Sequence, residues 1–585
     1  MRDAVRMRCA LLFASLCACA SQAPCNLTGD WCCLPTHVVQ TGLRVVSTAS
    51  YADGVGALVG RNLTLTFTPG STLHGDVDAG CDTVRWETGA VWSRAVQPYP
   101  APSWAKNLSI LELNPLVYTS PNGTGAFGSG SGTWASLTAR VAHWHSLGIS
   151  GVWLAYYNVA SAFWHNILTV YGAVDPPALD PRLGSEADFR AFMAACKAAG
   201  VRVFLDVVGA GLVPTSPYVT LYPEWFTFPG PSPPYNMANY NYSNPDFLAW
   251  WTGVWVDWVL DFGVDGLRLD SNVLYPMHPV YDNIAAAAAA AGHEIAIFGE
   301  NTPYMFGEHD YMAPGAYPGA PTALNDIPAA LANHVRQLQR DNNNNTSILG
   351  GGCLATVCFS YHDMGGAGNP GGASTPRSNV TLGIRGSRAR FGAIGILGPF
   401  IPLFMGGDEY GESPLVWLDA MNCSDGGAAD CGWLYGSVRQ WDQLRAPAQA
   451  AALADASALF ALRAAHADVL HHDACAAAAA LLPLPLAPPL PPAPLEITPY
   501  ARWAPGEKAL LVVANTGAVD VALAVAVPLA AMGLAGRGSY RVQALFGAPS
   551  APTVLPEAAL AALPLTVRAD GAAGGGLVVV LVTPA

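Results

Sequence analysis

Short apolar runs alternate with helix-like patterns through the middle of the chain, and this alternation restricts its fold more than any other feature. The runs are continuous, which is typical of parallel strands buried on both faces. Helical patterns separate them, as at Ser185–Ala199 and Asp246–Phe262. This order predicts an α/β fold, a (β/α)8 TIM barrel, with strands at Leu108–Leu113, Ile149–Leu154, Val201–Val208, Val264–Leu269, Ile295–Phe298, Leu354–Ser360 and Phe400–Met405. A further strand is expected between about residues 310 and 350, where no apolar run marks it.

Both ends of the chain carry an alternating apolar–polar pattern instead. Residues 24–100 predict a small N-terminal β module, and residues 497–585 predict a C-terminal antiparallel β-sandwich. The barrel is expected over residues 103–445, with a short loop domain at about 209–245. A helix and an Ala/Pro-rich loop are expected over residues 446–496.

Two tryptophans of the N-terminal module allow two interpretations. Trp86 and Trp92 lie six residues apart and share one strand face if the strand is unbroken. The first interpretation is an aromatic face packed in the core of the module. The second is a surface that stacks on sugar rings.

The composition excludes several classes of protein. Only 12% of the 585 residues are charged, about half the usual share. The formal net charge is −14, and nucleic-acid binders need clustered Lys and Arg, so no nucleic-acid partner is expected. The apolar run near the chain start is too short to cross about 30 Å of hydrocarbon, so no membrane span is expected. The 17 Trp, 21 Tyr and 19 Phe exclude an unfolded chain.

The N-terminus resembles a secretory signal over residues 1–20, because basic residues precede an apolar run that ends at Ala18-Cys19-Ala20. Sequons for N-linked glycans follow at Asn26, Asn62, Asn107, Asn122, Asn241, Asn344, Asn345, Asn379 and Asn422. Ten cysteines remain after the signal, which favours disulfide bonds in an oxidising compartment. We therefore expect a secreted protein or one in the secretory-pathway lumen, the alternative being an organelle lumen such as that of a plastid.

Four carboxylates follow predicted strands: Asp206, Asp270, Glu300 and Asp363. In a (β/α)8 barrel the carboxyl ends of the strands build the active site, so these groups are expected to converge. For any single one of them, the alternative is a helix N-cap.

The segments around these carboxylates resemble the α-amylase family of glycoside hydrolases, in the order that the family has them. The resemblance covers about residues 103–445. It is carried by Leu111-Glu112-Leu113-Asn114-Pro115, Asn241-Tyr242-Ser243-Asn244-Pro245, Gly263-Val264-Asp265-Gly266-Leu267-Arg268-Leu269-Asp270, Phe298-Gly299-Glu300, Tyr361-His362-Asp363 and Gly406-Gly407-Asp408-Glu409.

The resemblance implies retaining glycosidase chemistry by two carboxylates. Asp270 is expected to be the nucleophile and Glu300 the general acid, and Asp363 is expected to bind the hydroxyls of the −1 sugar. Further substrate-binding residues implied in the same way are Arg268, His362, Asp206, His165 and Tyr171. No organic cofactor is implied.

The chain departs from the family pattern in two segments. The third strand usually continues Asp-Val-Val-X-Asn-His, but this chain has Ala210 and Gly211 in place of the Asn and the His. That Asn often ligates calcium, so no metal site is predicted, although calcium stays open. Ile167 replaces a sugar-stacking Tyr, and His165, Trp164 and Tyr171 are candidates to compensate for the missing contacts.

Three functions remain open from the sequence. The leading hypothesis is an active retaining α-glucan hydrolase or transglycosylase, with a neutral α-glucan or oligosaccharide as its substrate. The second is a catalytically weak or inactive α-amylase-like protein that binds carbohydrate or a protein partner. The third is a barrel hydrolase for another sugar.

Overall fold

The computed structural model describes the chain in segments that together hold the barrel, the loop domain and both terminal β regions. These are residues 29–32, 36–41, 44–49, 54–59, 61–67, 72–77, 83–87, 91–94, 99–119, 132–155, 157–160, 172–232, 237–270, 277–300, 304–307, 354, 356–359, 388–398, 400–412, 439, 441–471, 481–486, 497–570 and 574–585. The chain divides into two compact units, Met1–Val96 and Gln97–Ala585. The expected signal over residues 1–20 lies outside the described residues. Cys196 is buried and forms no disulfide.

The first unit is a closed barrel of antiparallel strands, in which each strand pairs with its neighbours in sequence and β8 pairs with β1. Closure leaves no edge strand open to further pairing. Its core contains Val45, Leu58, Leu63, Leu65, Val77, Val84 and Trp86. The strands are β1 (Gly29–Cys32), β2 (Thr36–Thr41), β3 (Arg44–Ala49), β4 (Gly54–Val59), β5 (Asn62–Phe67), β6 (Thr72–Val77), β7 (Thr83–Trp86) and β8 (Val91–Arg94).

The strand expected to carry both tryptophans is interrupted. β7 ends at Trp86 and β8 begins at Val91, so Trp86 and Trp92 lie on neighbouring antiparallel strands, with Val84 opposite Trp92. Only 3% of Trp86 is exposed, and its side chain packs in the core of this unit. Trp86 therefore offers no surface on which a sugar could stack.

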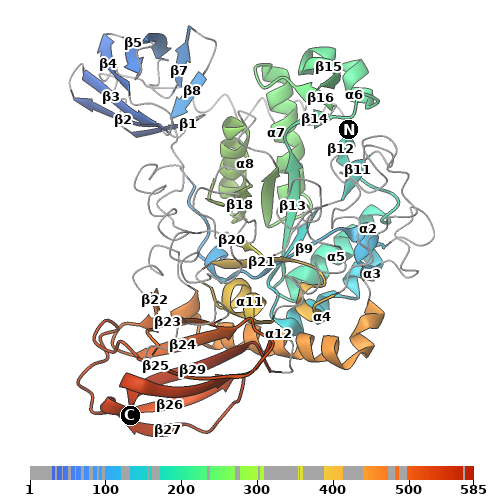
Figure 1. Ribbon diagram of the computed structural model, residues 1–585. Helices are drawn as coiled ribbons and strands as arrows, with labels where there is room; N and C mark the ends of the chain where they lie inside the picture. The colour runs from blue at the N-terminus through green and yellow to red at the C-terminus, as the bar shows by residue number, and fades with distance from the viewer. Residues whose placement is uncertain are drawn as a thin grey trace. The chain divides into compact units, whose positions relative to one another are not determined.

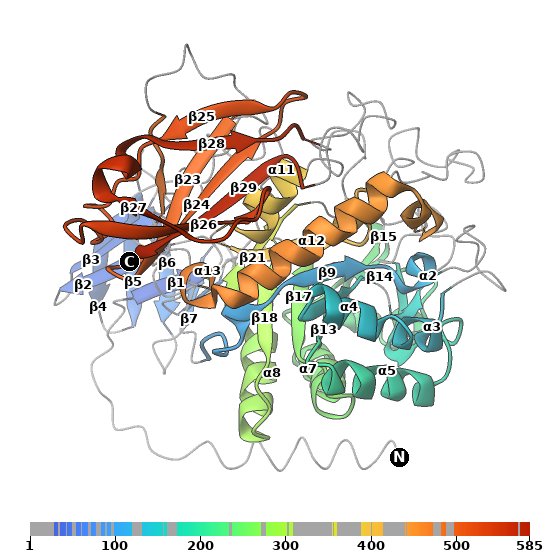
Figure 2. The same cartoon turned by 90° about the horizontal axis from the view of Figure 1, so that it is seen from below.

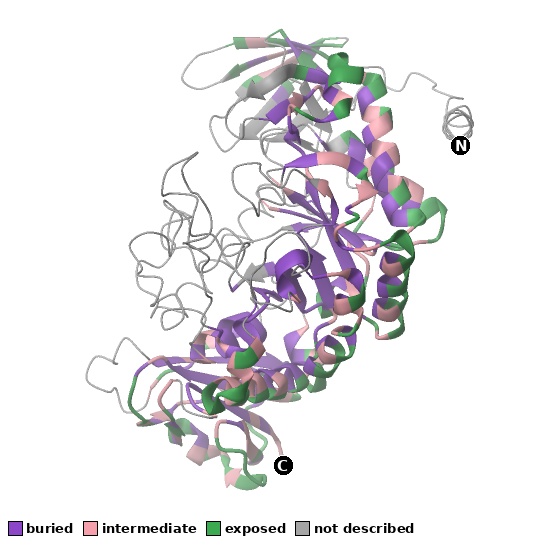
Figure 3. Cartoon of the chain, turned by 90° about the vertical axis from the view of Figure 1, so that its right-hand side faces the viewer, coloured by how far each residue is buried: buried purple, intermediate pink, exposed green. Residues whose placement is uncertain are grey.

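In the second unit, a curled parallel sheet of eight strands has the order β19-β18-β17-β13-β10-β9-β21-β20. Figure 1 labels five of them, β9, β13, β18, β20 and β21. Apart from β9 and β21, which are the first and last of these strands along the chain, neighbours in this order are successive strands of the sheet, as in a (β/α)8 barrel. Figure 3 shows that most of this sheet is buried, which explains the continuous apolar runs. The strands are β9 (Ile110–Leu113), β10 (Gly151–Leu154), β13 (Arg202–Val208), β17 (Gly266–Asp270), β18 (Ala296–Gly299), β19 (Phe306–Gly307), β20 (Thr356–Cys358) and β21 (Ile401–Met405).

The predicted fold class is confirmed, whereas the strand expected between about 310 and 350 lies outside the described residues. The sixth strand, β19, comes earlier and has two residues, with Phe306 in register with Phe298 of β18. A strand this short leaves no apolar run in the sequence, and only its pairing with β18 reveals it.

Helices cover the outside of the parallel sheet (Figures 1 and 2). Helix α5 begins at a capping box, in which Ser185 accepts from the Asp188 N–H and Asp188 accepts from the Ser185 N–H. The side chain of Asn244 caps α7, whose Trp251, Trp255 and Trp258 are buried. The described helices are α2 (Pro115–Tyr118), α3 (Trp134–Thr138), α4 (Val141–Leu147), α5 (Glu186–Ala198), α6 (Pro217–Leu221), α7 (Pro245–Leu260), α8 (His278–Ala290), α11 (Arg388–Arg390), α12 (Pro447–Ala465) and α13 (Ala467–Leu470).

A small antiparallel sheet extends the chain directly after β13. It has the order β14 (Gly211–Leu212), β16 (Met237–Tyr240), β15 (Phe226–Ser232). Gly211 pairs with Asn239, and a Cβ built on Gly211 would lie 2.0 Å from the carbonyl oxygen of Ala238. The strand pairing therefore leaves no room for a side chain at this position. A separate hairpin, β11 (Asn158–Ala160) with β12 (Ala173–Leu179), lies earlier in the chain.

The C-terminal region is an antiparallel β domain of two sheets, with orders β22-β23-β24-β29-β26-β27 and β25-β28. Leu481–Pro483 of the expected Ala/Pro-rich loop forms β22, because it pairs with β23. The strands are β22 (Leu481–Pro483), β23 (Ile497–Ala504), β24 (Lys508–Asn515), β25 (Val521–Val525), β26 (Ser539–Phe546), β27 (Thr553–Pro556), β28 (Leu563–Val567) and β29 (Leu577–Pro584).

Two buried arginines join this domain to the segment that enters β21. Arg502 of β23 donates to the carbonyl oxygen of Gly398 at 2.9 Å, and Arg463 of α12 donates to those of Ile396 and Phe400 at 2.6 and 3.0 Å. Tyr500 donates to the carbonyl oxygen of Ala393 at 2.6 Å. The backbone leading into the last barrel strand is thus held by side chains from α12 and the β domain.

Three buried carboxylates follow β21. Glu409 accepts from the Gly407 N–H at 2.6 Å, Asp408 accepts from the Met405 N–H at 3.2 Å, and Glu412 pairs with Arg439 at 2.8 Å. Burial, with added repulsion from Asp408 and Glu412, raises the pKa of Glu409 from 4.5 to about 7. Glu409 therefore keeps its proton at a pH at which exposed glutamates have lost theirs.

The first prediction concerns Gly211. Gly211→Ala forces a Cβ into the backbone of β16, so we expect a loss of stability of about 1–3 kcal/mol and a lower Tm. The matched control is Gly253→Ala in α7, where a Cβ meets nothing within 4 Å. This control should raise stability by about 1 kcal/mol, because alanine favours helix. Thermal unfolding of both variants tests the difference, and equal effects would contradict it.

The second prediction concerns Glu409. Its folded-state pKa lies above its ordinary value, so unfolding releases a proton between pH 4.5 and about 7, and its contribution to stability falls as the pH rises through this window. Glu409→Gln cannot lose a proton, so it lacks this decrease in stability. The Tm of Glu409→Gln minus the Tm of wild type should therefore increase between about pH 5 and about pH 8, by the equivalent of about 3 kcal/mol.

Scanning calorimetry at several pH values measures this difference. The control Glu186→Gln alters an exposed side chain on α5 and should show no such trend. A Tm difference that stays constant with pH would refute the assignment to Glu409.

Candidate active site

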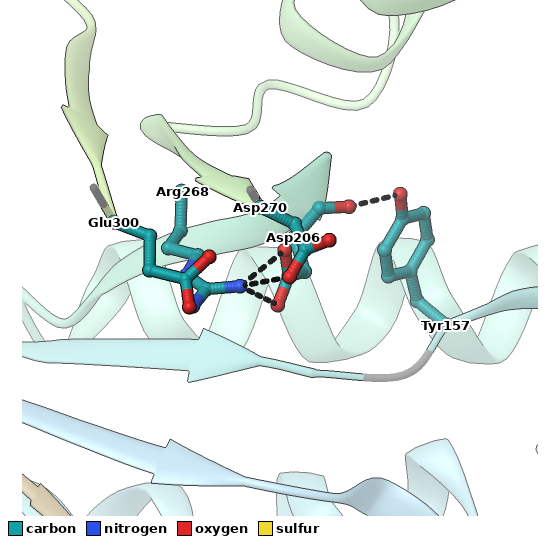
Figure 4. A network of polar contacts seen from close by, with 5 residues as sticks. All are labelled: Tyr157, Asp206, Arg268, Asp270 and Glu300. Atoms are coloured by element: carbon teal, nitrogen blue, oxygen red, sulfur yellow. Dashed lines mark hydrogen bonds and ion pairs between the residues drawn. The ribbon is translucent and has the colours of Figure 1, made fainter. Parts of the chain in front are cut away.

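The candidate site is built around one buried guanidinium group, that of Arg268. Its Nη1 contacts Asp270 Oδ1 at 2.8 Å and Asp206 Oδ2 at 3.3 Å, and its Nη2 contacts Glu300 Oε1 at 3.3 Å. Figure 4 shows the guanidinium between Glu300 on one side and the two aspartates on the other. Three of the four carboxylates expected from the sequence therefore meet at one cation.

Strand register explains this convergence. β13, β17 and β18 are adjacent parallel strands, in which Asp206 lies opposite Arg268 and Arg268 lies opposite Phe298. Arg268 and Asp270 are two residues apart on one strand, so their side chains share a face. Glu300 follows β18 directly, and its N–H donates to the carbonyl oxygen of Leu269 at 3.1 Å. All three carboxylates thus come from the carboxyl ends of neighbouring strands.

Exposure separates the charged groups into two kinds. Asp270 and Glu300 remain 16% and 23% exposed, whereas Arg268 and Asp206 are 0% and 2% exposed. Asp270 and Glu300 can therefore be reached by a ligand. Asp206 is buried against Arg268, where it holds the guanidinium in place.

Two aromatic residues that the motifs did not reveal support this arrangement. The ring of Trp153 on β10 lies 4.7 Å from the Arg268 guanidinium carbon, a cation–π distance. The Tyr157 hydroxyl donates to the backbone oxygen of Asp206 at 2.8 Å (Figure 4). Burial, with the nearby Asp206 charge, raises the pKa of Tyr157 well above its usual value, so it stays a donor. Trp153 sits inside an expected strand, whereas no local pattern marks Tyr157.

Several expected site residues lie outside the described residues, so their roles stay predictions. They are Asp363, His362, His165 and Tyr171, together with Ile167.

The end of the third strand differs from the family pattern for a structural reason. Gly211 belongs to β14 and packs against the backbone of β16, so a histidine does not fit there. Ala210 is buried, and its carbonyl oxygen accepts from the Tyr240 N–H at 3.2 Å. The Tyr242 hydroxyl donates to the Gly209 carbonyl oxygen at 2.7 Å.

These donors do not fit a calcium ion, which takes six to eight oxygen ligands. Ala210 offers a methyl group, and the carbonyl oxygens of Gly209 and Ala210 already accept hydrogen bonds. Within the described ranges, no cluster of three or more His, Cys, Asp or Glu side chains is arranged to hold a metal. The third-strand position therefore lacks the ligands of a calcium site.

We compared the chain with known proteins. No protein-family model matches it. Trehalose-6-phosphate hydrolase of Escherichia coli (strain K12) is 26% identical over 207 residues, covering 29% of this chain and 36% of that protein. Alpha-amylase MalA of Haloarcula japonica is 23% identical over 249 residues, covering 39% of this chain and 34% of that protein. The chain thus spans about a third of the length of these curated relatives.

Solved structures share the fold over most of the chain. A maltogenic α-amylase, AmyB from Thermotoga neapolitana, has a TM-score of 0.58 at 16% identity, covering 82% of this chain and 99% of that one. An α-amylase from Geobacillus thermoleovorans in complex with acarbose has a TM-score of 0.54 at 13% identity, covering 82% and 99%. The chain is thus similar in sequence to two curated proteins, a trehalose-6-phosphate hydrolase and an α-amylase, over about a third of their length, and it shares its fold with solved α-amylases.

Proposed function

We propose that the chain is a retaining α-glucan hydrolase or transglycosylase that cleaves α-glucosidic bonds through a covalent glycosyl-enzyme intermediate. The observation that carries this proposal is the Arg268 guanidinium bridging Asp206, Asp270 and Glu300 at the carboxyl ends of adjacent strands. Two accessible carboxylates flanking one cation supply the nucleophile and the acid that this chemistry needs.

Asp270 is the nucleophile in this proposal. The 2.8 Å contact with Arg268 favours its ionised form and fixes the direction of its carboxylate. Asp270 attacks the anomeric carbon, and the bond to the leaving oxygen breaks as the new ester bond forms. Because Arg268 is itself held by Asp206 and by the Trp153 ring, the nucleophile needs little reorganisation to react.

Glu300 is the general acid. It protonates the leaving oxygen, then accepts a proton from water or from an acceptor sugar hydroxyl that attacks the intermediate. Asp363 and His362 hold the −1 sugar in this proposal, with His165 and Tyr171 from the loop after the second strand.

The substrate we propose is a neutral glucan rather than a phosphorylated sugar. In the described part of the site the cation is Arg268, and it already contacts three carboxylates. A phosphate group would meet a surplus of negative charge there.

The second candidate function is carbohydrate binding with weak or no catalysis. One specific observation favours it: β14 leaves no space at Gly211, so a sugar contact usual in the family cannot come from that position. The loss of one contact made in the transition state lowers the rate without preventing binding.

We also propose that the protein is exported to the secretory-pathway lumen or secreted, with a plastid lumen as the alternative. The apolar segment before Ala20 and the nine sequons support this. Asn62 and Asn107 are exposed, as glycan acceptors need to be. None of the helices in the described segments could cross a membrane.

The third prediction tests the catalytic roles. Glu300→Gln and Asp270→Asn should each lower kcat on maltooligosaccharides by about 10²–10⁴-fold, because each removes one proton-transfer or bond-forming group. A reducing-sugar assay measures this, with Glu186→Gln as the surface control. Equal, negligible release of sugar by wild type and both variants would favour the binding function instead. Product lengths from a maltoheptaose digest separate hydrolysis from transglycosylation.

The fourth prediction concerns metal removal. Because the third-strand position lacks calcium ligands, dialysis against a chelator should leave both Tm and starch hydrolysis unchanged. Thermal unfolding and the same assay, before and after chelation and with calcium added back, measure this. A calcium-reversible drop in Tm would show that the chain binds the ion elsewhere.

A further inference from the structure

Four aromatic rings gather on the segment between β13 and β17, and we call Tyr218, Tyr222, Trp225 and Trp250 the aromatic platform. Tyr222 stacks on Trp225 with ring centroids 4.1 Å apart and planes 11° apart. Trp225 stacks on Trp250 at 4.9 Å, and Trp250 meets Tyr218 at 4.9 Å. Tyr218 belongs to α6, Trp225 to the short 3₁₀ helix Pro223–Trp225 and Trp250 to α7, and Tyr222 lies between α6 and the 3₁₀ helix.

The platform has a rigid base and an open outer ring. Trp225 is 8% exposed, but Tyr222 is 39% and its neighbour Leu221 is 66% exposed. Among the described residues, Tyr222 is the aromatic side chain in the set of large exposed apolar residues. Since its ring is already fixed on Trp225, binding a flat ligand there costs little side-chain entropy.

Hydrogen bonds to the backbone hold the platform in place. The side-chain amides of Asn241 and Asn244 donate to the carbonyl oxygen of Glu224 at 3.2 and 3.1 Å. Asn244 also caps α7, which carries Trp250. These bonds tie the 3₁₀ helix with Trp225 to the start of α7, so the stacked rings form one preorganised surface.

The charge around the platform selects a neutral ligand. No Lys or Arg occurs between Arg202 and Arg268, the stretch that contains all four rings. Glu224 is exposed two residues after Tyr222 in the chain, and its carboxylate can accept hydrogen bonds from hydroxyls. Phosphate, nucleic acid or an acidic peptide would find no positive charge in this stretch, whereas a sugar presents one apolar ring face and peripheral hydroxyls.

We propose that the aromatic platform binds an α-glucan chain outside the catalytic site, by stacking a glucose ring on Tyr222. The choice of an α-glucan rests on the proposed function. The platform segment follows β13, which carries Asp206, and leads back into the sheet at β17, which carries Arg268 and Asp270. A polymer held there is bound by the segment that connects the strands carrying Asp206, Arg268 and Asp270.

Aromatic contacts continue from the platform toward the third strand. Trp225 contacts Phe247 at a centroid distance of 6.4 Å, and Phe247 contacts Tyr242 at 5.4 Å. Tyr242 in turn bonds to the Gly209 carbonyl oxygen. The platform is therefore supported by the same segment that ends the third strand, and it acts on long substrates rather than on the bond-breaking step.

The fifth prediction measures binding without turnover, in full chains that carry Glu300→Gln. Tyr222→Ala should weaken binding to starch granules and to β-cyclodextrin by about tenfold, the worth of one aromatic stacking contact. Tyr222→Phe keeps the ring and should bind as the parent does. Leu260→Ala, which removes another exposed apolar side chain from α7 (41% exposed), is the matched control and should also leave binding unchanged.

Activity in the wild-type background gives a second measurement. Tyr222→Ala should raise KM for soluble starch. With maltotriose as substrate, both kcat and KM should stay unchanged. Loss of starch binding in Tyr222→Ala, in a chain that hydrolyses nothing, would uphold the platform and refute the catalytic function. An active chain in which Tyr222→Ala binds starch as the parent does would refute the platform and leave the catalytic function standing.

Two further outcomes overturn the proposal. A Tyr222→Ala variant that changes from dimer to monomer in light scattering would make the platform a subunit interface. Equal weakening by Leu260→Ala would show that binding depends on general exposed apolar surface and not on the ring.

Discussion

The architecture of the candidate site depends on one buried cation shared by three carboxylates. Arg268 has no exposed surface, and an isolated charge in such a place would cost many kcal/mol. Asp206, Asp270 and Glu300 compensate it, but only if β13, β17 and β18 keep their register. Conversely, removing Arg268 would leave three acidic groups facing one another. The charge balance of the site therefore depends on the strand register, and the strand register in turn is favoured by this charge balance.

The charged groups around Arg268 lie at a sheet whose interior is otherwise mostly apolar. Most of the sheet interior is aliphatic or aromatic, and Trp153 and Phe298 are buried around Arg268. In such a low-dielectric interior each ion pair is strengthened, and water competes less for the hydrogen bonds. The same principle explains Glu409, which has neighbouring carboxylates and no cation of its own in the contacts described, and which keeps its proton instead.

Whether a feature could be predicted from the sequence depends on whether it follows from a local pattern or from contacts between distant segments. The placement of Asp206, Asp270 and Glu300 was predictable, because strand ends in a parallel barrel meet at one edge. The support from Tyr157 and Trp153 was not, since it depends on how neighbouring strands are aligned. β19 was missed because two residues carry no periodicity. The constraint on Gly211 arises from Ala238, a contact that only the pairing of β14 with β16 creates.

The arginine contacts near the end of the chain bear on whether the terminal β domain could be removed from the second unit. Arg502 belongs to the terminal β domain, yet it donates a hydrogen bond to the carbonyl oxygen of Gly398, in the segment that leads into β21 of the parallel sheet. A terminal domain joined only by a linker can be removed without exposing polar groups of its neighbour. This one supplies hydrogen-bond donors to the interior of its neighbour, so its removal would leave buried backbone carbonyl oxygens without those partners.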